Sequence, residues 1–333
     1  MRIALKKNST TDILLLVFSI IGVLFAAEVI MRFSWEMGGW KKRPIYRRSF
    51  NPYLRYELSP GATSEVVSVN SDGFRGPEYF LQKPPDTFRI LMLGDSETLS
   101  VSLKPTDTLA AQLEGLLNKN SKSLHYEVLN FGVEGYNTLQ ELEQLKTKGL
   151  KYNPDLIILN YVLNDPEPGE YFFNKSFFMR HSALVRYFSY RIKKALIRRE
   201  RRRLKIHTEV EHFYYLHQPK FFNHINNAIL EMADIAKKKN SRLLVVIFPA
   251  SSTAVKDFKE NYPYRRLHEL VKSIKSDNII FIDLIEEFNR LGRTPYDVSI
   301  GYAQEESHKN ASALGAAANY IYGILKNNKA IPQ

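Results

Sequence analysis

Residues 89–95 read RILMLGD, and the polar residues Ser96, Glu97 and Thr98 follow at once. A short apolar run that ends in such a turn is typical of a strand buried on both faces of a parallel sheet. Four similar runs follow, separated by segments of helical periodicity: YEVLNFG (126–132), PDLIILNYV (154–162), RLLVVIFP (242–249) and NIIFIDL (278–284). This alternation predicts an α/β fold with three α/β/α layers around a doubly wound, parallel, five-stranded sheet.

Amphipathic helices are expected around these strands. Their predicted ranges are 106–119, 138–150, 223–239, 262–275 and 311–327. The connection from 165 to 222 is far longer than the usual loop between a strand and a helix. We therefore expect an insertion with structure of its own at about 166–222.

The composition fits an ordinary globular protein. The chain has 333 residues, of which 44% are hydrophobic and 25% are charged. It has room for one large or two modest domains, and it is neither collagen-like nor disordered throughout. It contains no cysteine, which excludes disulfides, thiol nucleophiles, iron–sulfur clusters and cysteine-ligated zinc.

The net charge of +12 is concentrated in one segment. Residues 180–205 hold eleven Lys and Arg against Glu200 alone, a net charge of +10, so the rest of the chain carries only +2. Apolar residues recur there at roughly helical spacing, which predicts a basic amphipathic helix. Its charges are interpreted as a solvated face, or as a contact with anionic lipid or an acidic polysaccharide at Arg198 to Lys205. Nucleic acid is not an expected partner, because the segment lacks the aromatic platforms of a single-strand binder.

The N-terminal region contains a candidate membrane span. Residues 13–31 read ILLLVFSIIGVLFAAEVIM, 19 residues whose only charge is Glu28. About 20 apolar residues cross the ~30 Å hydrocarbon layer, so we expect residues 1–33 to form an N-terminal tail and a transmembrane anchor. A cleaved signal peptide is the alternative, but the run is long and Phe25-Ala26-Ala27 is a poor cleavage site. Positive residues after the span outnumber those before it, a weak indication of a cytoplasmic body because long domains translocate largely regardless of charge.

Residues just after the predicted strands carry the candidate chemistry, because sites in open parallel sheets gather outside the carboxyl ends of the strands. Ser96 follows the first strand, Gly135 the second and Asn164 the third. A serine at a strand-to-helix turn is a candidate nucleophile, since its hydroxyl lies near a helix N-terminus. Taken alone, a helix cap is the simpler interpretation of this serine.

Of the eight histidines, His308 alone lies beyond the last predicted strand, in the loop that opens the final helix. It is a candidate general base for Ser96, or a histidine of an exposed loop. Glu305, three residues earlier, can fold back across a turn and orient the imidazole. The sequence has no His-Glu-x-x-His motif, no dinucleotide fingerprint and no Walker motif, so we expect no metal and no cofactor.

Four short blocks carry a resemblance to a known family. GDSE (94–97), NFGVEGYNT (130–138), LND (163–165) and ESHKN (306–310) resemble the four blocks of the SGNH/GDSL hydrolases, in the same order. That resemblance covers about 88–327. Two further stretches behind the N-terminal span, NPYLRYELSPG (51–61) and VNSDGFRGPE (69–78), are similar to the membrane-anchored branch of this family that is often associated with cell-envelope polysaccharides.

The resemblance implies a role for each matching residue. Ser96 is the expected nucleophile and His308 the expected general base. The expected oxyanion donors are the backbone N–H groups of Ser96 and Gly135 and the side-chain amide of Asn164. The family usually has Asp where Glu305 stands, so either Glu305 or Asp297 is expected to orient His308.

Other features of the resemblance concern the neighbouring residues and the domains. Asp95 is expected to brace the turn, and Leu163 stands where the family usually has a small residue, which could narrow the pocket. We expect three parts: the anchor (1–33), an extension with short strands (34–87) and an SGNH-like α/β domain (88–330).

The resemblance implies an anchored serine esterase that removes acyl groups, most plausibly O-acetyl, from an envelope glycan or a small ester through an acyl-enzyme. An acyltransferase that passes the acyl group to a sugar hydroxyl would use the same residues. A catalytically idle domain that binds glycan or an assembly partner is a third interpretation. The resemblance also implies that the body lies outside the cytoplasmic membrane, in a periplasm or at the cell surface.

Overall fold

The five apolar runs form one parallel sheet, which confirms the predicted fold. The computed structural model describes residues 9–35, 45–167, 177–252, 254–259, 261–301 and 308–332. The strands of the sheet lie in the spatial order β4-β3-β5-β6-β7, which is doubly wound with its switch point between β3 and β5. Their bounds are β3 (Thr87–Gly94), β4 (His125–Gly132), β5 (Leu156–Tyr161), β6 (Leu243–Ile247) and β7 (Ile279–Asp283).

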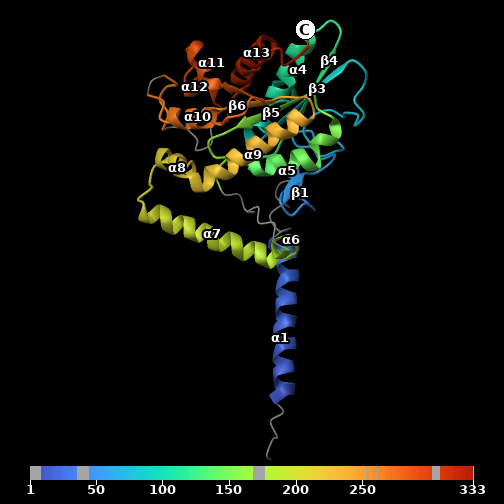
Figure 1. The fold of residues 1–333 in the computed structure, drawn as a ribbon, viewed down its shortest axis with the longest axis vertical. Coiled ribbons are helices and arrows are strands. Elements are labelled where there is room, and N and C mark those ends of the chain that lie inside the picture. The colour runs from blue at the N-terminus through green and yellow to red at the C-terminus, as the bar shows by residue number, and fades with distance from the viewer. Residues whose placement is uncertain are drawn as a thin grey trace, which may run out of the picture.

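Helices cover both faces of this sheet (Figure 1). One face carries α4 (Leu109–Asn120) and α13 (Ala311–Asn327), which pack on each other, and the other carries α5 (Thr138–Thr147) and α9 (Pro219–Lys238). The three predicted layers are therefore present. Further short helices in the described part of the body are α3 (Ser96–Leu99), η3 (Pro105–Asp107), η4 (Gly149–Tyr152), α10 (Arg265–Lys272), α11 (Leu284–Arg290) and α12 (Pro295–Val298).

The described residues between β5 and β6 contain three helices before α9. They are α6 (Phe177–His181), α7 (Ala183–Arg203) and α8 (Glu209–Leu216), and α8 leads into α9. Helix α7 contains most of the basic residues of the segment 180–205 and runs along the lower side of the body (Figure 1).

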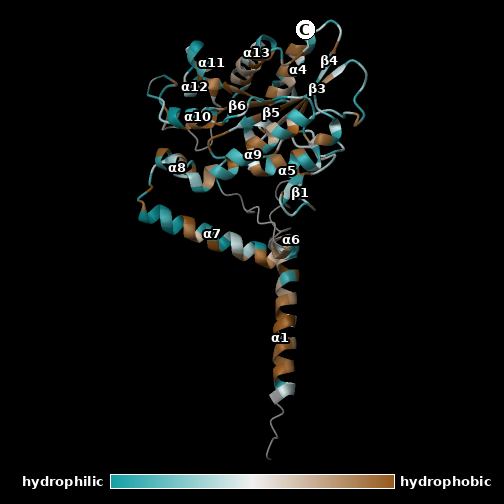
Figure 2. Cartoon of the chain, in the orientation of Figure 1, coloured by the Kyte–Doolittle hydropathy of each residue, from teal (hydrophilic) through white to brown (hydrophobic). Residues whose placement is uncertain are grey.

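The N-terminal helix α1 (Ser9–Ile30) projects from the body and continues into one π-helical turn, η1 (Met31–Trp35) (Figure 1). Residues Thr10–Ser34 are long and apolar enough to cross a membrane, and the most apolar stretch buries none of its side chains in the body. Figure 2 shows α1 as hydrophobic along most of its length. A signal sequence can meet the same criteria of length and composition.

The extension before the sheet packs onto the body through a small hydrophobic core of its own. Strands β1 (Tyr46–Arg48) and β2 (Tyr56–Leu58) form an antiparallel pair. Leu54 and Val69 of the extension are buried against Leu99, Val133 and Tyr136, which follow β3 and β4. The extension therefore supports the loops at the carboxyl ends of these two strands.

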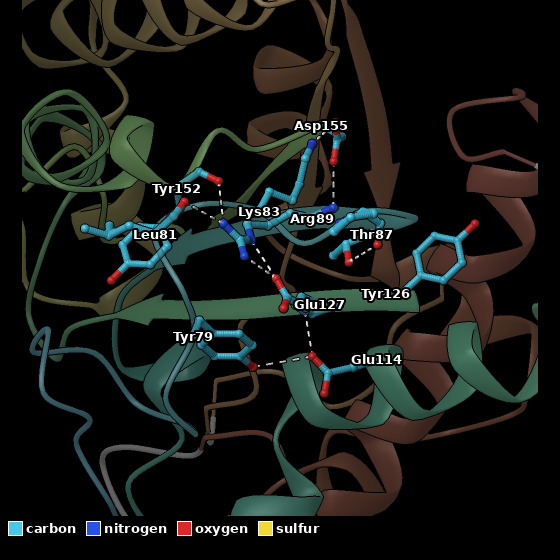
Figure 3. Close-up of polar contacts among 12 residues, drawn as sticks. Tyr79, Leu81, Lys83, Thr87, Arg89, Glu114, Tyr126, Glu127, Tyr152 and Asp155 are labelled. Atoms are coloured by element: carbon cyan, nitrogen blue, oxygen red, sulfur yellow. Dashed lines mark hydrogen bonds and ion pairs between the residues drawn. The ribbon is translucent and has the colours of Figure 1, made fainter. Parts of the chain in front are cut away.

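A second attachment of the extension lies at the opposite end of the sheet (Figure 3). The fully buried guanidinium of Arg89 donates to Glu127 Oε2 on β4 at 2.6 Å and to the Tyr152 carbonyl at 2.7 Å. Lys83 of the extension pairs with Asp155, whose other carboxylate oxygen accepts from the Arg89 backbone N–H. A buried charge is tolerated when it is paired and hydrogen-bonded, so this network serves to hold the extension, β3 and β4 together.

Candidate active site

The turn after β3 presents Ser96 at the N-terminus of a short helix, α3 (Ser96–Leu99). The helix cap is Asp95, whose Oδ1 accepts from the Glu97 backbone N–H at 2.9 Å. Ser96 is the first helical residue, so its hydroxyl is not used as the cap. The capping interpretation of Ser96 is therefore wrong, because the neighbouring carboxylate performs that role.

His308 meets Ser96 from a segment 212 residues further along the chain: His308 Nε2 lies 2.9 Å from Ser96 Oγ. The histidine is held by backbone pairing on both sides, since Ile300 N–H donates to its carbonyl at 2.7 Å and Asn310 N–H donates to the Val298 carbonyl at 2.8 Å. The Ser96 hydroxyl also lies 3.3 Å from Asp95 Oδ2. A histidine Nε2 within hydrogen-bond distance of a serine hydroxyl is the geometry expected of a general base and its nucleophile.

A buried ion pair joins the two segments that carry these residues. Glu97 Oε1 lies 3.2 Å from Lys309 Nζ, and Glu97 Oε2 accepts from the Lys309 backbone N–H at 2.9 Å. The Lys309 side chain is 1% exposed. Glu97 and Lys309 are the direct neighbours of Ser96 and His308 in sequence, so this pair fixes how His308 meets Ser96.

Ser96 and His308 line a cavity of about 290 Å³ at the carboxyl ends of the strands. Gly135 and Asn164 line the same cavity, so the structure brings together three candidate donors of an oxyanion hole. Within the described part of the chain, no hydrogen-bond acceptor is present for the backbone N–H of Ser96, the backbone N–H of Gly135 or the Asn164 side-chain amide. Such N–H groups can stabilise negative charge that develops on a substrate oxygen.

The position of Gly135 requires a glycine. Its φ is +75°, and a Cβ there would lie 2.7 Å from the Tyr56 hydroxyl. That hydroxyl donates to the Glu134 carbonyl at 2.5 Å. In a trans peptide the carbonyl and the next N–H point in opposite directions, so the contact that holds the Glu134 carbonyl also fixes the direction of the Gly135 N–H.

Three buried carboxyl groups lie at or behind the cavity. Burial and the nearby Glu97 carboxylate raise the pKa of Asp95 to about 6. Burial raises the pKa of Glu141 well above its ordinary value, with repulsion from Asp165 and Asp95 adding to it. Burial and repulsion from Asp95 likewise raise the pKa of Asp165 well above its ordinary value. Asp165 accepts from Thr138 Oγ1 at 2.8 Å, whereas neither carboxyl oxygen of Glu141 has a partner among the described residues. Asp165 thus braces the loop that carries Asn164, and Glu141 is best accommodated in its protonated form.

Two carboxylates, Glu305 and Asp297, were predicted as alternatives for orienting His308. Glu305 lies outside the described residues. Asp297, the alternative, is exposed and uses Oδ2 to accept from the Thr294 backbone N–H at 2.8 Å and from Thr294 Oγ1 at 2.7 Å. No hydrogen bond joins Asp297 to His308 in the described part of the chain. Asp297 instead completes the capping box of α12, whose N-cap is Thr294.

Several residues of the site were not found from the sequence. Glu97, Lys309 and Tyr56 stand inside the matching blocks, but no role was predicted for them, because their roles depend on tertiary contacts. Helix α8 of the insertion contributes Glu209 and Phe213 to the wall of the cavity. Leu163 lines it as well, at the position where the family resemblance predicts a narrowing.

The structure also bears on cofactor chemistry. Within the described ranges, no three His, Asp or Glu side chains form a group with metal-binding geometry.

Comparisons with known proteins give structural neighbours only. No family model matches the chain, and no curated protein matches it in sequence. TesA is 14% identical and covers 72% of this chain and 98% of its own, with a TM-score of 0.43. An acetyl xylan esterase, AlAXEase, is 14% identical (72% and 100% covered, TM-score 0.44), as is a putative lipolytic protein of the G-D-S-L family from Desulfitobacterium hafniense DCB-2 (71% and 99% covered, TM-score 0.41). Identities this low and TM-scores below 0.5 leave the function to be argued from the site.

Proposed function

We propose that this chain is a membrane-anchored serine esterase of the SGNH/GDSL type that acts through an acyl-enzyme. The observation that carries the proposal is the 2.9 Å contact between Ser96 Oγ and His308 Nε2, inside a cavity that Gly135 and Asn164 also line. A serine beside a base and three N–H donors form a set of groups suited to acyl transfer.

In the proposed reaction Ser96 Oγ attacks the ester carbonyl carbon while His308 Nε2 takes the serine proton. The carbonyl oxygen becomes an oxyanion, which the N–H groups of Ser96 and Gly135 and the Asn164 amide stabilise. Collapse of this intermediate breaks the bond to the alcohol, and His308 gives its proton to the leaving oxygen. Water then repeats the sequence on the acyl-enzyme, which releases the carboxylic acid and restores the serine.

Glu305 is proposed to orient His308, as the resemblance implies. It stands three residues before the histidine, a spacing that allows its carboxylate to accept from Nδ1–H and keep the proton-accepting nitrogen toward Ser96. The capping contacts of Asp297 support this choice, because they occupy that carboxylate with Thr294.

The substrate is proposed to be an acylated envelope glycan, with acetyl as the acyl group. A cavity of about 290 Å³ suits a small acyl group with one part of a larger alcohol. The anchor is proposed to keep the enzyme at the membrane, with its body on the extracytoplasmic side, as the resemblance to the anchored branch implies. Transfer of the acyl group to a sugar hydroxyl in place of water would use the same residues.

The test is hydrolysis of p-nitrophenyl acetate by the full-length protein in detergent, beside Ser96→Ala, His308→Ala and Glu305→Ala. We expect turnover that is lost in the first two variants and reduced in the third. Folded wild-type protein without turnover would reject the esterase in favour of a binding domain. A new acylated sugar formed when a sugar acceptor is added would identify a transferase.

A further inference from the structure

Helix α7 starts beside the end of α1, at the junction between the anchor and the body, and runs to one side below the body (Figure 1). Its 21 residues give it a length of about 30 Å. One side of α7 faces the body and another is turned away from it, and the side chains on these two sides differ.

The start of α7 is fixed to the last turn of α1. The Glu28 carboxylate of α1 accepts hydrogen bonds from Ser182 Oγ at 2.7 Å, Ala183 N–H at 2.8 Å and Leu184 N–H at 3.0 Å. Arg32 pairs with the same carboxylate at 2.7 Å. The first N–H groups of a helix need acceptors, and a negative charge there is favourable. The one acidic residue in the apolar run therefore sets where α7 begins, at the level where the apolar run ends.

One side of α7 faces the body. Arg186 is buried, and Lys193, Ile197 and Glu200 are half-buried. These positions recur at intervals of seven, four and three residues, so they share one side of the helix. At the far end Glu200 accepts from the Tyr215 hydroxyl of α8, which holds this side of α7 to the body.

Another side, turned away from the body, is apolar and exposed. Phe188, Ile192 and Leu196 recur every four residues and are 54%, 58% and 57% exposed. Exposed arginines follow them in the last turns: Arg198, Arg199, Arg202 and Arg203. An exposed apolar stripe next to a cluster of arginines is typical of a helix that lies in a membrane interface.

We propose that α7 lies in the interface of the membrane that α1 spans, with the apolar stripe at the boundary of the acyl chains and its arginines on anionic lipid headgroups. The proposal rests on the anchoring of α1 proposed above. Continuity with the end of the span places α7 at headgroup level. An acidic polysaccharide would match the arginines but would leave Phe188, Ile192 and Leu196 in water, so the stripe favours lipid.

This arrangement gives the cavity a fixed position above the membrane. Helix α7 is tied to α1 through Glu28 and to α8 through Glu200, and α8 contributes Glu209 and Phe213 to the cavity wall. The body is then held by two supports, a span and a helix lying along the surface, instead of rotating about a single one.

The test uses single cysteines in the full-length protein, which has none of its own. Ile192→Cys, Ile20→Cys in α1 and Phe80→Cys, at a 77% exposed position of the body, each receive an environment-sensitive nitrobenzoxadiazole label. The proteins are placed in nanodiscs of phosphatidylcholine alone or with phosphatidylglycerol, and quenching by a doxyl-labelled lipid is measured. Circular dichroism checks that each variant is folded.

We expect the label at 20 to be quenched in both discs and the label at 80 in neither. The label at 192 is expected to be quenched in the phosphatidylglycerol discs and clearly less in phosphatidylcholine alone, because attraction of arginines to anionic lipid adds to the apolar contact. Quenching at 20 but not at 192 would overturn the proposal while leaving the anchor intact, and no quenching at 20 would overturn both. Equal quenching at 192 in the two discs, or a response there only to added heparin, would overturn the assignment to anionic lipid.

Discussion

The contact between Tyr56 and the Glu134 carbonyl gives the sharpest prediction about the proposed oxyanion hole. Tyr56→Phe removes one hydroxyl, which lies 2.5 Å from that carbonyl, and leaves the ring in place. The Glu134–Gly135 peptide loses the contact that fixes its direction, so the Gly135 N–H is aimed less well at the substrate oxygen.

The hydrogen bond from Tyr56 to the Glu134 carbonyl orients the Gly135 N–H and also stabilises the fold, so its loss should affect both kcat and the free energy of unfolding. Loss of a whole oxyanion donor lowers kcat by about 10²- to 10³-fold. Tyr56→Phe disorders the donor and does not delete it, so we expect a fall in kcat of about 10- to 100-fold with little change in KM. The loss of one hydrogen bond costs about 1 kcal/mol of the free energy of unfolding.

The matched control is Tyr46→Phe. The Tyr46 hydroxyl donates to the Glu134 side chain at 2.9 Å and not to its peptide. Removal of a hydrogen bond to a carboxylate costs about 1.5–3 kcal/mol, so this variant is expected to lose at least as much stability and yet to keep kcat within about twofold. The assay is p-nitrophenyl acetate hydrolysis, with urea unfolding followed by circular dichroism. Equal kcat values for the two variants would refute the positioning role of Tyr56.

Three further predictions concern the buried charges. Lys309→Met leaves the Glu97 carboxylate buried without its cation, so urea unfolding should show a loss of about 3–5 kcal/mol in the free energy of unfolding. The double variant Glu97→Gln/Lys309→Met should regain most of that loss. A double variant no more stable than Lys309→Met would contradict the pairing. The pKa of Asp95 in the folded state is raised from 3.8 to about 6. The free energy of unfolding should therefore fall by up to about 3 kcal/mol as the pH rises between these two values. Asp95→Asn should remove this fall, and an unchanged pH profile in that variant would contradict the assignment to Asp95. Glu141→Gln should leave the free energy of unfolding unchanged or raise it at pH 8, because its buried carboxyl lacks described partners; a loss above about 1 kcal/mol would show that the carboxylate itself is needed.

The sheet could be predicted because its strands are buried on both faces. A run such as RILMLGD has no polar side to obscure it, and β3 begins only two residues earlier than predicted. Helix α5 ends at Thr147 and not at 150, since Gly149 begins the tighter turn η4. Helices α11 and α12 were not predicted, because seven and four residues are too few to show a helical period.

The meeting of Ser96 and His308 could be predicted because both follow strands at one end of the sheet, a rule of parallel topology. The supports of the site could not be predicted in the same way. Tyr56 lies in a three-residue strand whose docking depends on the small core around Leu54 and Tyr136. Lys309 is almost fully buried. Lysines are mostly exposed in proteins, so the sequence alone places this side chain at the surface.

The most direct test of the central claim is the reaction of the full-length protein with a fluorophosphonate, followed by mass spectrometry of the labelled peptide. The account predicts one adduct, on Ser96, that is absent in Ser96→Ala and forms about 10²- to 10⁴-fold more slowly in His308→Ala. An adduct on another residue, or none on protein whose circular dichroism shows it to be folded, would contradict it.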